Sequence, residues 1–358
     1  MNPYGTGGGG FDYRGLAFLY PPITLYVLEP LTLLSYRSGL LAFLTLKLAA
    51  LAALLIVWHR NFEPLSPAWP TVLFLAYAFN APILKDIEAG NIAVFEQLGL
   101  WLAFAFMMRD RPYMAGAILA VIAQFKLMPI LFLGLLLIPC PQPRWKPFWI
   151  SLGLFVVLLA SNAVLLPDMT RQFIDMFGAN VPHLDERGSI NPSSLALVRD
   201  AADELTRLGF PVGRTAANLT FVAIIGLIGA PAVWLVWARQ DVVRRDPKWA
   251  IYLACTIFAI ATPRMKDYSY ILLLIPALHV ARAFLDGKLS QASLFPLVLL
   301  VALPYIGFIR GLVPYIPLLS AWFLLYYLVR LRLDEILPQP GKTEPLADFS
   351  HPQQSAKT

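Results

Sequence analysis

Long apolar runs separated by short polar connections dominate the chain. About eleven runs are long enough to be considered as membrane spans. They lie at 38–58, 69–84, 91–108, 112–125, 127–138, 147–166, 215–237, 249–262, 268–284, 292–309 and 312–330. Many approach the helix length that crosses about 30 Å of hydrocarbon. The pattern predicts an all-α membrane protein, a polytopic bundle of about ten or eleven transmembrane helices.

Two neighbouring runs are too short to cross the membrane upright. Residues 112–125 and 127–138 each supply roughly 20 Å of helix at 1.5 Å per residue. We expect them to form a tight hairpin that turns at Lys126-Leu127-Met128-Pro129.

Composition agrees with a membrane protein and excludes other classes. Hydrophobic residues make up 58% of the 358 residues and charged residues only 14%, with mean hydropathy +0.64. A soluble globular enzyme, a disordered chain and a disulfide scaffold are therefore excluded. The net charge of +6 is explained by basic residues in loops, so no nucleic-acid partner is expected. Cys140 lies in a loop and Cys255 in an apolar run, which argues against a disulfide between them.

The distribution of basic residues predicts the orientation. Placing the loop at Arg60 inside and alternating the spans leaves most Lys and Arg residues of the short connections on the inner face. The long loop 167–212 then lies outside, and residues 332–358 form a disordered cytoplasmic tail. The transmembrane domain is expected over 37–331.

The N-terminal segment 1–36 must also lie outside in this arrangement. Its apolar stretch from Leu16 to Leu34 is interrupted by Pro21, Pro22 and Pro30, and we interpret it as an interfacial or re-entrant segment. No preceding helix would carry it across, so we expect that a first transmembrane helix is missing and that Met1 is an internal methionine or the start of a fragment.

The outer face collects cations in unusual places. Lys126 lies at the tip of the short hairpin, and Arg264 and Lys266 lie in the connection TPRMKDYSY. Lys126 either extends to the interface or binds a lipid-linked phosphate. Phosphate binding is favoured for Arg264 and Lys266, since the positive-inside rule does not account for them. Asp267 is expected to neutralise these neighbours.

Other polar residues within apolar runs have simpler explanations. Lys47 and Glu96 either form a buried ion pair or line a cavity, and a structural pairing is favoured. Asn162 and His279 are interpreted as satisfied polar groups of the core. No cluster of His, Cys and carboxylates has metal-ligand spacing, and whether a divalent metal ion takes part stays open.

Asn2-Pro3-Tyr4 and, further along the chain, Tyr20-Pro21-Pro22 resemble the NPY and YPP region of glycosyltransferase family 87, and the resemblance covers about 1–330. Gly90-Asn91-Ile92 stands where the family starts a span, and the run from Ala115 to Pro129 is similar to its hairpin with a lysine and a proline. Two later motifs also resemble the family: Asn191-Pro192-Ser193-Ser194 is similar to its NQS loop motif, and Thr262-Pro263-Arg264 to its late SP motif.

The resemblance implies an inverting GT-C membrane glycosyltransferase. Such an enzyme moves a hexose, with mannose favoured, from a polyprenyl-phosphate donor to a glycolipid or envelope-glycan acceptor. It would act at the extracytoplasmic face of a bacterial cytoplasmic membrane, with its C-terminus in the cytoplasm. The donor phosphate would be bound by Lys126, Arg264 and Lys266, and the substrates by Tyr20, Asn91 and Asn191.

This chain departs from the family pattern at two positions. The family's catalytic Asp follows a first transmembrane helix upstream of the NPY stretch, and this chain begins at that stretch. The catalytic base is therefore assigned to Asp12 or, failing that, Glu88. Asn91 stands in place of a glutamine, which puts amide recognition there in doubt.

Two other classes of function remain open. A lipid-linked glycan transporter or flippase would also need outward cations and polar groups within the membrane. A degenerate, non-catalytic membrane subunit would explain the absent Asp. Transfer of the sugar without movement of the intact lipid-linked glycan would distinguish an enzyme from a transporter. A knockout complemented with a catalytically inactive form would distinguish an enzyme from a non-catalytic subunit.

Overall fold

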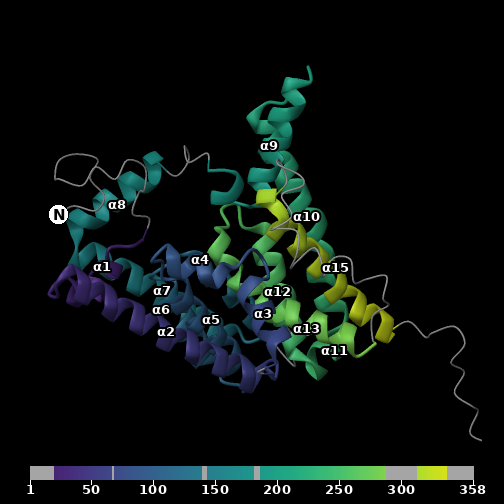
Figure 1. Ribbon diagram of the computed structural model, residues 1–358, viewed down its shortest axis with the longest axis horizontal. Coiled ribbons are helices and arrows are strands. Elements are labelled where there is room, and N and C mark those ends of the chain that lie inside the picture. Colours follow the sequence, from purple (N-terminus) through teal and green to yellow (C-terminus); the bar gives the residue numbers. More distant parts are fainter. Residues whose placement is uncertain (1–19, 67, 139–142, 181–185, 288–312, 337–358) are drawn as a thin grey trace, which may run out of the picture.

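The structure, a computed structural model, describes residues 20–66, 68–138, 143–180, 186–287 and 313–336, and these form helices with no strand among them. Figure 1 labels the main elements. The helices and 3-10 helices are α1 (Ile23–Thr32), α2 (Tyr36–Asn61), α3 (Trp69–Tyr77), α4 (Pro82–Glu88), α5 (Ala93–Met108), α6 (Pro112–Ile122), η1 (Met128–Leu137), α7 (Trp145–Leu165), α8 (Pro167–Asn180), η3 (Gly188–Ile190), α9 (Ser194–Arg207), α10 (Arg214–Ala238), α11 (Gln240–Arg245), α12 (Pro247–Ala261), η4 (Asp267–Leu273), α13 (Leu274–Leu285), η7 (Val313–Tyr315) and α15 (Ile316–Ile336).

Four of the described segments are long and apolar enough to cross a membrane. Three of them, α2, α7 and α10, bury only 11–17% of their most apolar window, so their surfaces are left for lipid. The fourth, Asp267–Leu285, buries 72% of that window and forms the centre of the bundle. Shorter apolar helices of 10–17 residues, including α5, α6, η1 and α12, complete it. The prediction of an all-α membrane protein is confirmed.

The N-terminal half is a bundle in which α5 packs between α2 and α6, and α6 between α5 and α7. Trp58 and Trp101 meet edge to face with ring centroids 5.9 Å apart. Close approach of α6 and α7 depends on Gly116, because a Cβ there would lie 1.8 Å from Ser151 Oγ. Small residues at helix contacts are the usual way for membrane helices to pack closely.

The structure differs from the predicted spans in several places. The expected span 69–84 is two helices, α3 and α4, separated by Phe79, Asn80 and Ala81 with positive φ. Since such φ values interrupt a right-handed helix, this run cannot cross as one rod. The predicted hairpin at 126–129 is confirmed, with α6 before it and η1 after it. The expected span 292–309 lies outside the described residues.

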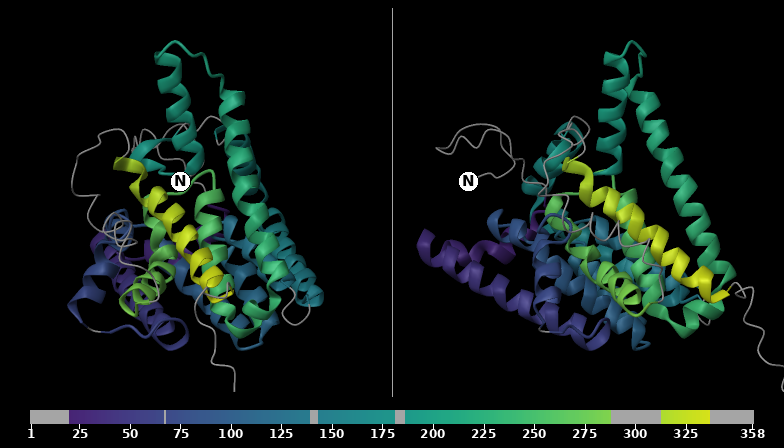
Figure 2. Two further views of the ribbon diagram at one scale, coloured as in Figure 1. Left: turned by 90° about the vertical axis from the view of Figure 1, so that its right-hand side faces the viewer. Right: turned by 45° about the vertical axis from the view of Figure 1, so that its right-hand side comes forward.

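The predicted long loop 167–212 contains regular structure. Helices α8 and α9 lie within it, joined by a segment that includes η3. Helix α9 packs against α10, and this pair rises above the rest of the molecule in both views of Figure 2. The expected disordered tail from 332 begins in helix, since α15 continues to Ile336, and residues 337–358 lie outside the described residues.

Of the predicted interfacial segment 1–36, residues 20–36 are described. They contain α1, a short helix whose surface is largely exposed and which contacts α2. The Ile23 amide donates to Asn162 Oδ1 at 2.8 Å, which fixes the start of α1 on α7 and satisfies that buried amide group.

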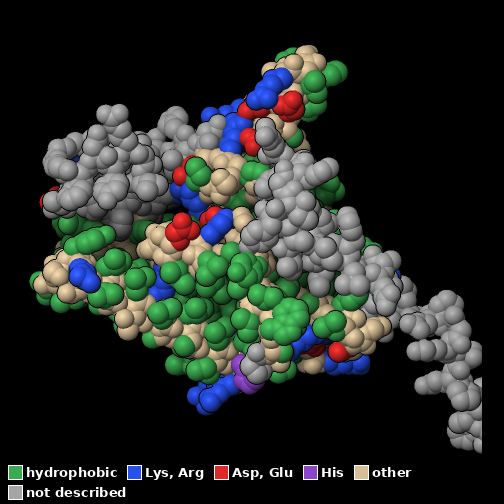
Figure 3. Space-filling view, in the orientation of Figure 1, with side chains coloured by type: hydrophobic (Ala, Val, Ile, Leu, Met, Phe, Trp, Pro, Cys, Tyr) green, Lys and Arg blue, Asp and Glu red, His purple; other side chains and the backbone are tan. Residues whose placement is uncertain are grey.

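Charged side chains gather at two ends of the bundle. Helix α5 carries Glu96 in its first turn and is followed by Arg109 at its other end. Arg109 donates to Asn61 Oδ1 at 2.7 Å, and Lys248 donates to the Phe62 carbonyl at 2.8 Å, so predicted inner connections meet at that end. Figure 3 shows charged patches above and below a broad hydrophobic surface. Such a band is the surface that a bilayer would cover.

Candidate functional site

The connection between α12 and η4 is held in place by the segment before α9. Ser193 Oγ donates to the Pro263 carbonyl at 2.7 Å, and the Met265 amide donates to Asn191 Oδ1 at 2.9 Å. The Tyr270 hydroxyl donates to the Pro192 carbonyl at 2.7 Å. Two motifs that lie far apart in the sequence, 191–194 and 262–264, therefore form one rigid unit. The Asn191 side chain is buried and engaged in this scaffold.

A carboxylate joins the two cations of this connection. Glu186 Oε2 accepts from Arg264 Nε at 2.8 Å and from Lys266 Nζ at 2.6 Å, and Glu186 Oε1 accepts from Arg264 Nη2 at 2.9 Å. These are charge-assisted bonds, and the Arg264 contact has the bidentate geometry that also suits phosphate.

The two cations impose pKa shifts in this cluster. Burial works to raise the pKa of Glu186, but hydrogen bonds from Arg264 and Lys266 outweigh it and hold that pKa below its usual value. Burial lowers the pKa of Lys266, the bond to Glu186 opposes this, and the nearby charge of Arg264 adds to the lowering. The cluster is thus a pair of crowded cations stabilised by one anion.

Lys126 lies at the hairpin tip and faces a second carboxylate. Its Nζ is 2.7 Å from Glu96 Oε2 and 3.4 Å from Ser269 Oγ, and it lies 5.6 Å from the centre of the Tyr268 ring. The Lys126 side chain is 27% exposed and that of Glu96 8%. The Lys126 side chain is therefore partly exposed, whereas its counter-ion is buried. Glu96 is therefore paired, as expected, but its partner is Lys126 and not Lys47.

The remaining predicted substrate-binding residues lie beside this pair. The Tyr20 hydroxyl donates to Asn91 Oδ1 at 3.3 Å, and that oxygen also accepts from the Ile92 amide at 2.7 Å. The charges of Lys126 and Glu96 act on the hydroxyl groups of both Tyr20 and Tyr268. The charge of Arg264 also acts on Tyr268. Tyr268 contacts Lys126 through its ring and follows Lys266 by two residues, so we treat the two cation clusters as one candidate site.

Two further ion pairs support the turn that carries Asn91. Lys85 Nζ is 2.9 Å from Asp267 Oδ2, which ties α4 to η4. The ion-pair partner of Asp267 is therefore Lys85 and not the neighbouring Arg264 or Lys266. Lys47 Nζ donates to the Asp86 carbonyl at 2.7 Å and lies 3.1 Å from Asp86 Oδ2, with both side chains almost fully buried. Lys47 is therefore also in a structural pairing, and its partner is Asp86.

The two predicted catalytic bases differ in how the structure describes them. Asp12 lies outside the described residues. Glu88 is exposed at the end of α4, close in sequence to Asn91, and no described residue bonds to its side chain.

Sequence reasoning missed three groups of this site. Glu186 is one of several acidic residues in the loop 167–212, so the sequence did not single it out. Its role as the counter-ion of Arg264 and Lys266 follows only from the fold. Tyr268 and Ser269 are part of the connection TPRMKDYSY, but their proximity to Lys126 cannot be read from the sequence, since Lys126 is far away along the chain.

The opposite end holds a separate polar cluster and a small pocket. Glu63 Oε1 lies 2.7 Å from His279 Nδ1 and 3.3 Å from the Tyr252 hydroxyl, and Glu63 Oε2 accepts from Arg282 Nη1 at 3.0 Å. The contact with Glu63 gives the His279 ring a hydrogen-bond partner, as predicted.

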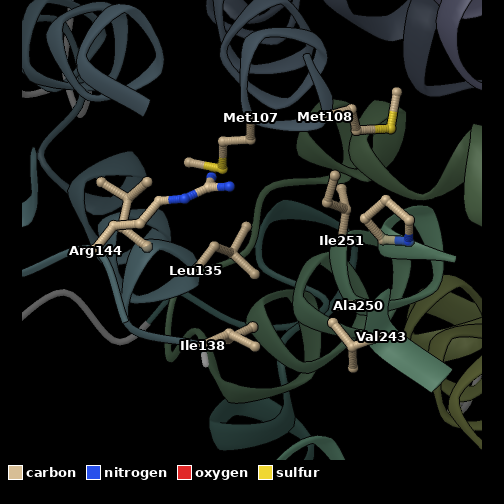
Figure 4. A pocket seen from close by; sticks show the side chains of 10 residues that line it. Met107, Met108, Leu135, Ile138, Arg144, Val243, Ala250 and Ile251 are labelled. Atoms are coloured by element: carbon tan, nitrogen blue, oxygen red, sulfur yellow. The ribbon is translucent and has the colours of Figure 1, made fainter. Parts of the chain in front are cut away.

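Figure 4 shows Arg144 beside a pocket between η1 and α12. In the described part of the chain, no group of three or more His, Cys, Asp and Glu side chains is arranged to hold a metal ion.

Comparison with known proteins identifies the family. The model of glycosyltransferase family 87 matches residues 18–263, which is more than half of the chain and narrower than the resemblance inferred from motifs. Tyr20, Asn91, Lys126 and Asn191 lie within the match, whereas Lys266 lies just after it. No curated protein matches the chain significantly. The chain belongs to glycosyltransferase family 87 and is a membrane glycosyltransferase.

Proposed function

We propose that this protein transfers a hexose, with mannose favoured, from a polyprenyl-phosphate donor to a glycolipid or envelope-glycan acceptor. The observation that supports this most directly is that Lys126 lies against Tyr268 and Ser269, in the same connection that carries Arg264 and Lys266 at one end of an apolar bundle. A lipid-linked phosphate needs cations at the edge of the hydrocarbon, and this arrangement meets that need.

The proposed reaction is an inverting displacement. The acceptor oxygen attacks the anomeric carbon while the bond from that carbon to the donor phosphate oxygen breaks, and the phosphate leaves with the electron pair. A carboxylate takes the proton of the acceptor hydroxyl. Glu88 and Asp12 are the proposed bases, and Glu88 is the one whose surroundings are described.

The cations would act on the departing phosphate. Negative charge grows on the phosphate as the bond breaks, so fixed cations there lower the barrier. Lys126 and Lys266 each have three ammonium protons, and their carboxylate partners do not use all of them. Glu96 and Glu186 would therefore hold the cations in position until the donor binds.

The proposed orientation places this site at the extracytoplasmic face of a bacterial cytoplasmic membrane. The opposite end carries Arg109, Arg144 and Lys248 among its basic residues, as the positive-inside rule requires of a cytoplasmic face. On this orientation α15 leads the C-terminus to the cytoplasm.

The proposal is tested with the purified chain in liposomes that contain a labelled polyprenyl-phosphate mannose and a membrane lipid extract as acceptor. We expect Lys126→Ala and Arg264→Ala to lower the transfer rate by about 10²-fold each, since a single donor to developing charge contributes that much. Arg245→Ala is the matched control, because Arg245 is exposed at the opposite end. Normal transfer by both site variants would remove the phosphate assignment.

A further inference from the structure

A pocket lies between the end of α2 and the start of α3, at the opposite end of the bundle from Lys126. Its volume is about 440 Å³. Leu55 and Ile56 of α2 line one side, and Val72 and Leu75 of α3 line the other. The two helices are not packed against each other along their length, which leaves this space between them.

The polar side chains of the pocket gather where the two helices are connected. His59 and Arg60 lie in the last turn of α2, Ser66 lies in the connection, and Thr71 lies in the first turn of α3. The apolar lining residues lie farther into each helix. The pocket therefore has a polar mouth and an apolar interior.

The mouth has hydrogen-bond donors to offer. The side chains of His59 and Arg60 are exposed, and no other described residue bonds to them. Ser66 Oγ accepts from the Ala68 amide at 3.2 Å, so the hydroxyl proton of Ser66 remains to be donated. A guanidinium, an imidazole and a hydroxyl at one mouth suit an oxyanion.

The charge around the mouth is positive. None of the described residues that line the pocket is acidic, and Glu63, the nearest acid in the sequence, is bonded to Arg282. Arg109 and Lys248 lie close by, because they bond to the two residues that directly follow Arg60. The mouth therefore attracts an anion, and it lacks the carboxylate that would pair with the ammonium group of a zwitterionic lipid.

The pocket lies where the protein surface passes from lipid to water. Helix α2 buries only 17% of its most apolar window, so it faces lipid. Trp69, the first residue of α3, is 73% exposed, as is typical of aromatic residues at a membrane boundary. Figure 3 shows histidine and basic side chains at the lower rim of the broad hydrophobic surface. A soluble anion would leave the apolar interior unfilled, and an uncharged hydrocarbon would leave the cations without a partner.

We propose that this pocket binds an anionic diacyl phospholipid, with its phosphate at Arg60 and the first part of its acyl chains against Leu55 and Leu75. Ester carbonyl oxygens follow the phosphate in such a lipid, and the hydroxyls of Ser66 and Thr71 can donate to them. Polyprenyl phosphate has no such carbonyl groups. The inference goes beyond the proposed function, because it concerns a different end of the bundle and a lipid that is not consumed.

Two variants remove the two halves of the pocket separately. Arg60→Ala removes the charge at the mouth, and Arg245→Ala, an exposed arginine outside the pocket, is its matched control. Val72→Trp fills the interior. Val156→Trp is the matched control for it, because Val72 and Val156 are each 54% exposed and Val156 lies on α7, outside the pocket.

The test measures lipid binding by the purified, delipidated full chain in detergent. Phosphatidylglycerol and phosphatidylcholine with the same acyl chains are titrated, and the apparent Kd is taken from the rise in melting temperature. We expect phosphatidylglycerol to bind more tightly than phosphatidylcholine. Arg60→Ala should raise the apparent Kd for phosphatidylglycerol about fivefold, as expected for one basic residue near a membrane surface. Val72→Trp should weaken binding at least as much, and Arg60→Lys, Arg245→Ala and Val156→Trp should stay near the wild type.

Several results would overturn the proposal. Equal binding of the two lipids, or an unchanged Kd in both pocket variants, would remove the site. Equal stabilisation by glycerol phosphate would make the occupant a soluble anion. A photoactivatable phosphatidylglycerol tests the wild type in liposomes even where a variant fails to fold. Labelling of peptides from residues 55–75 that excess phosphatidylglycerol suppresses supports the site, and absence of that labelling, or its suppression by polyprenyl phosphate alone, contradicts it.

Discussion

Replacement of Glu186 by Gln tests whether Arg264 and Lys266 bind the donor phosphate. Glu186 makes three bonds of 2.6–2.9 Å to these cations, so a phosphate that binds them would also meet the negative charge of its carboxylate. Glutamine keeps the shape and one accepting oxygen but removes the charge. The incoming phosphate then no longer competes with an anion for the same donors.

The size of the effect follows from the contacts. A hydrogen bond to a charged group contributes about 1.5–3 kcal/mol. The Glu186 side chain is 19% exposed and that of Arg264 34%, so solvent weakens each contact and the lower end applies. If donor binding replaces the equivalent of one such bond, relief of about 1.4 kcal/mol lowers the donor KM roughly tenfold.

The assay measures the donor KM in liposomes together with inhibition by polyprenyl phosphate, and thermal unfolding is followed in parallel. Glu204→Gln is the matched control, because Glu204 pairs with Arg207 at the exposed surface of α9. A Glu186→Gln enzyme that folds normally but has an unchanged or raised donor KM would refute the reasoning and remove these two cations from the phosphate site.

The other predictions concern stability and pH. Lys47→Met should lower the unfolding free energy by about 3–5 kcal/mol, because it leaves Asp86 buried without its cation. The double variant Lys47→Met/Asp86→Leu should recover most of this loss. Unfolding measured in a detergent series would contradict the prediction if the losses of the two single variants were additive. Glu63→Gln should cost about 1–3 kcal/mol through lost bonds to Tyr252, His279 and Arg282. Burial works to raise the pKa of Glu63, but His279 and Arg282 outweigh it and hold the pKa below its usual 4.5, so its stabilising contribution is present above that value and lost as the pH falls through the lowered pKa. Melting temperatures measured from pH 7 downward should therefore fall more steeply for the wild type than for Glu63→Gln, and parallel curves would argue against this role.

The periodic apolar runs were sufficient to predict the fold class and the helical hairpin. Residues 112–125 and 127–138 were too short for upright spans, and the chain does turn at Lys126. Length and hydropathy decide such features locally, so no tertiary information was needed.

The same signals failed where tertiary contacts decide the structure. Hydropathy does not reveal that Phe79, Asn80 and Ala81 break the run 69–84, because the break depends on backbone φ values and not on polarity. Helices α8 and α9 were predicted as loop, since their polar faces lower the mean hydropathy of a window.

Within the candidate site, sequence reasoning found the cations but not their partners. Lys126, Arg264 and Lys266 stood out because basic residues are unexpected on that face. Glu186 and Glu96 could not be matched to them, because each pair joins segments that are far apart in the chain. Opposite charges identify many possible pairs, and only the packing of helices selects among them.

The fate of the sugar distinguishes transfer from transport. The purified chain is placed in liposomes with polyprenyl-phosphate mannose labelled in the sugar and a defined glycolipid acceptor series, and the lipids are separated after incubation. If the protein is a transferase, we expect label on an acceptor, a matching amount of free polyprenyl phosphate, and loss of both products in Lys126→Ala. Label that stays on the donor, or donor that moves unchanged to the other leaflet, would contradict transfer and favour a transporter.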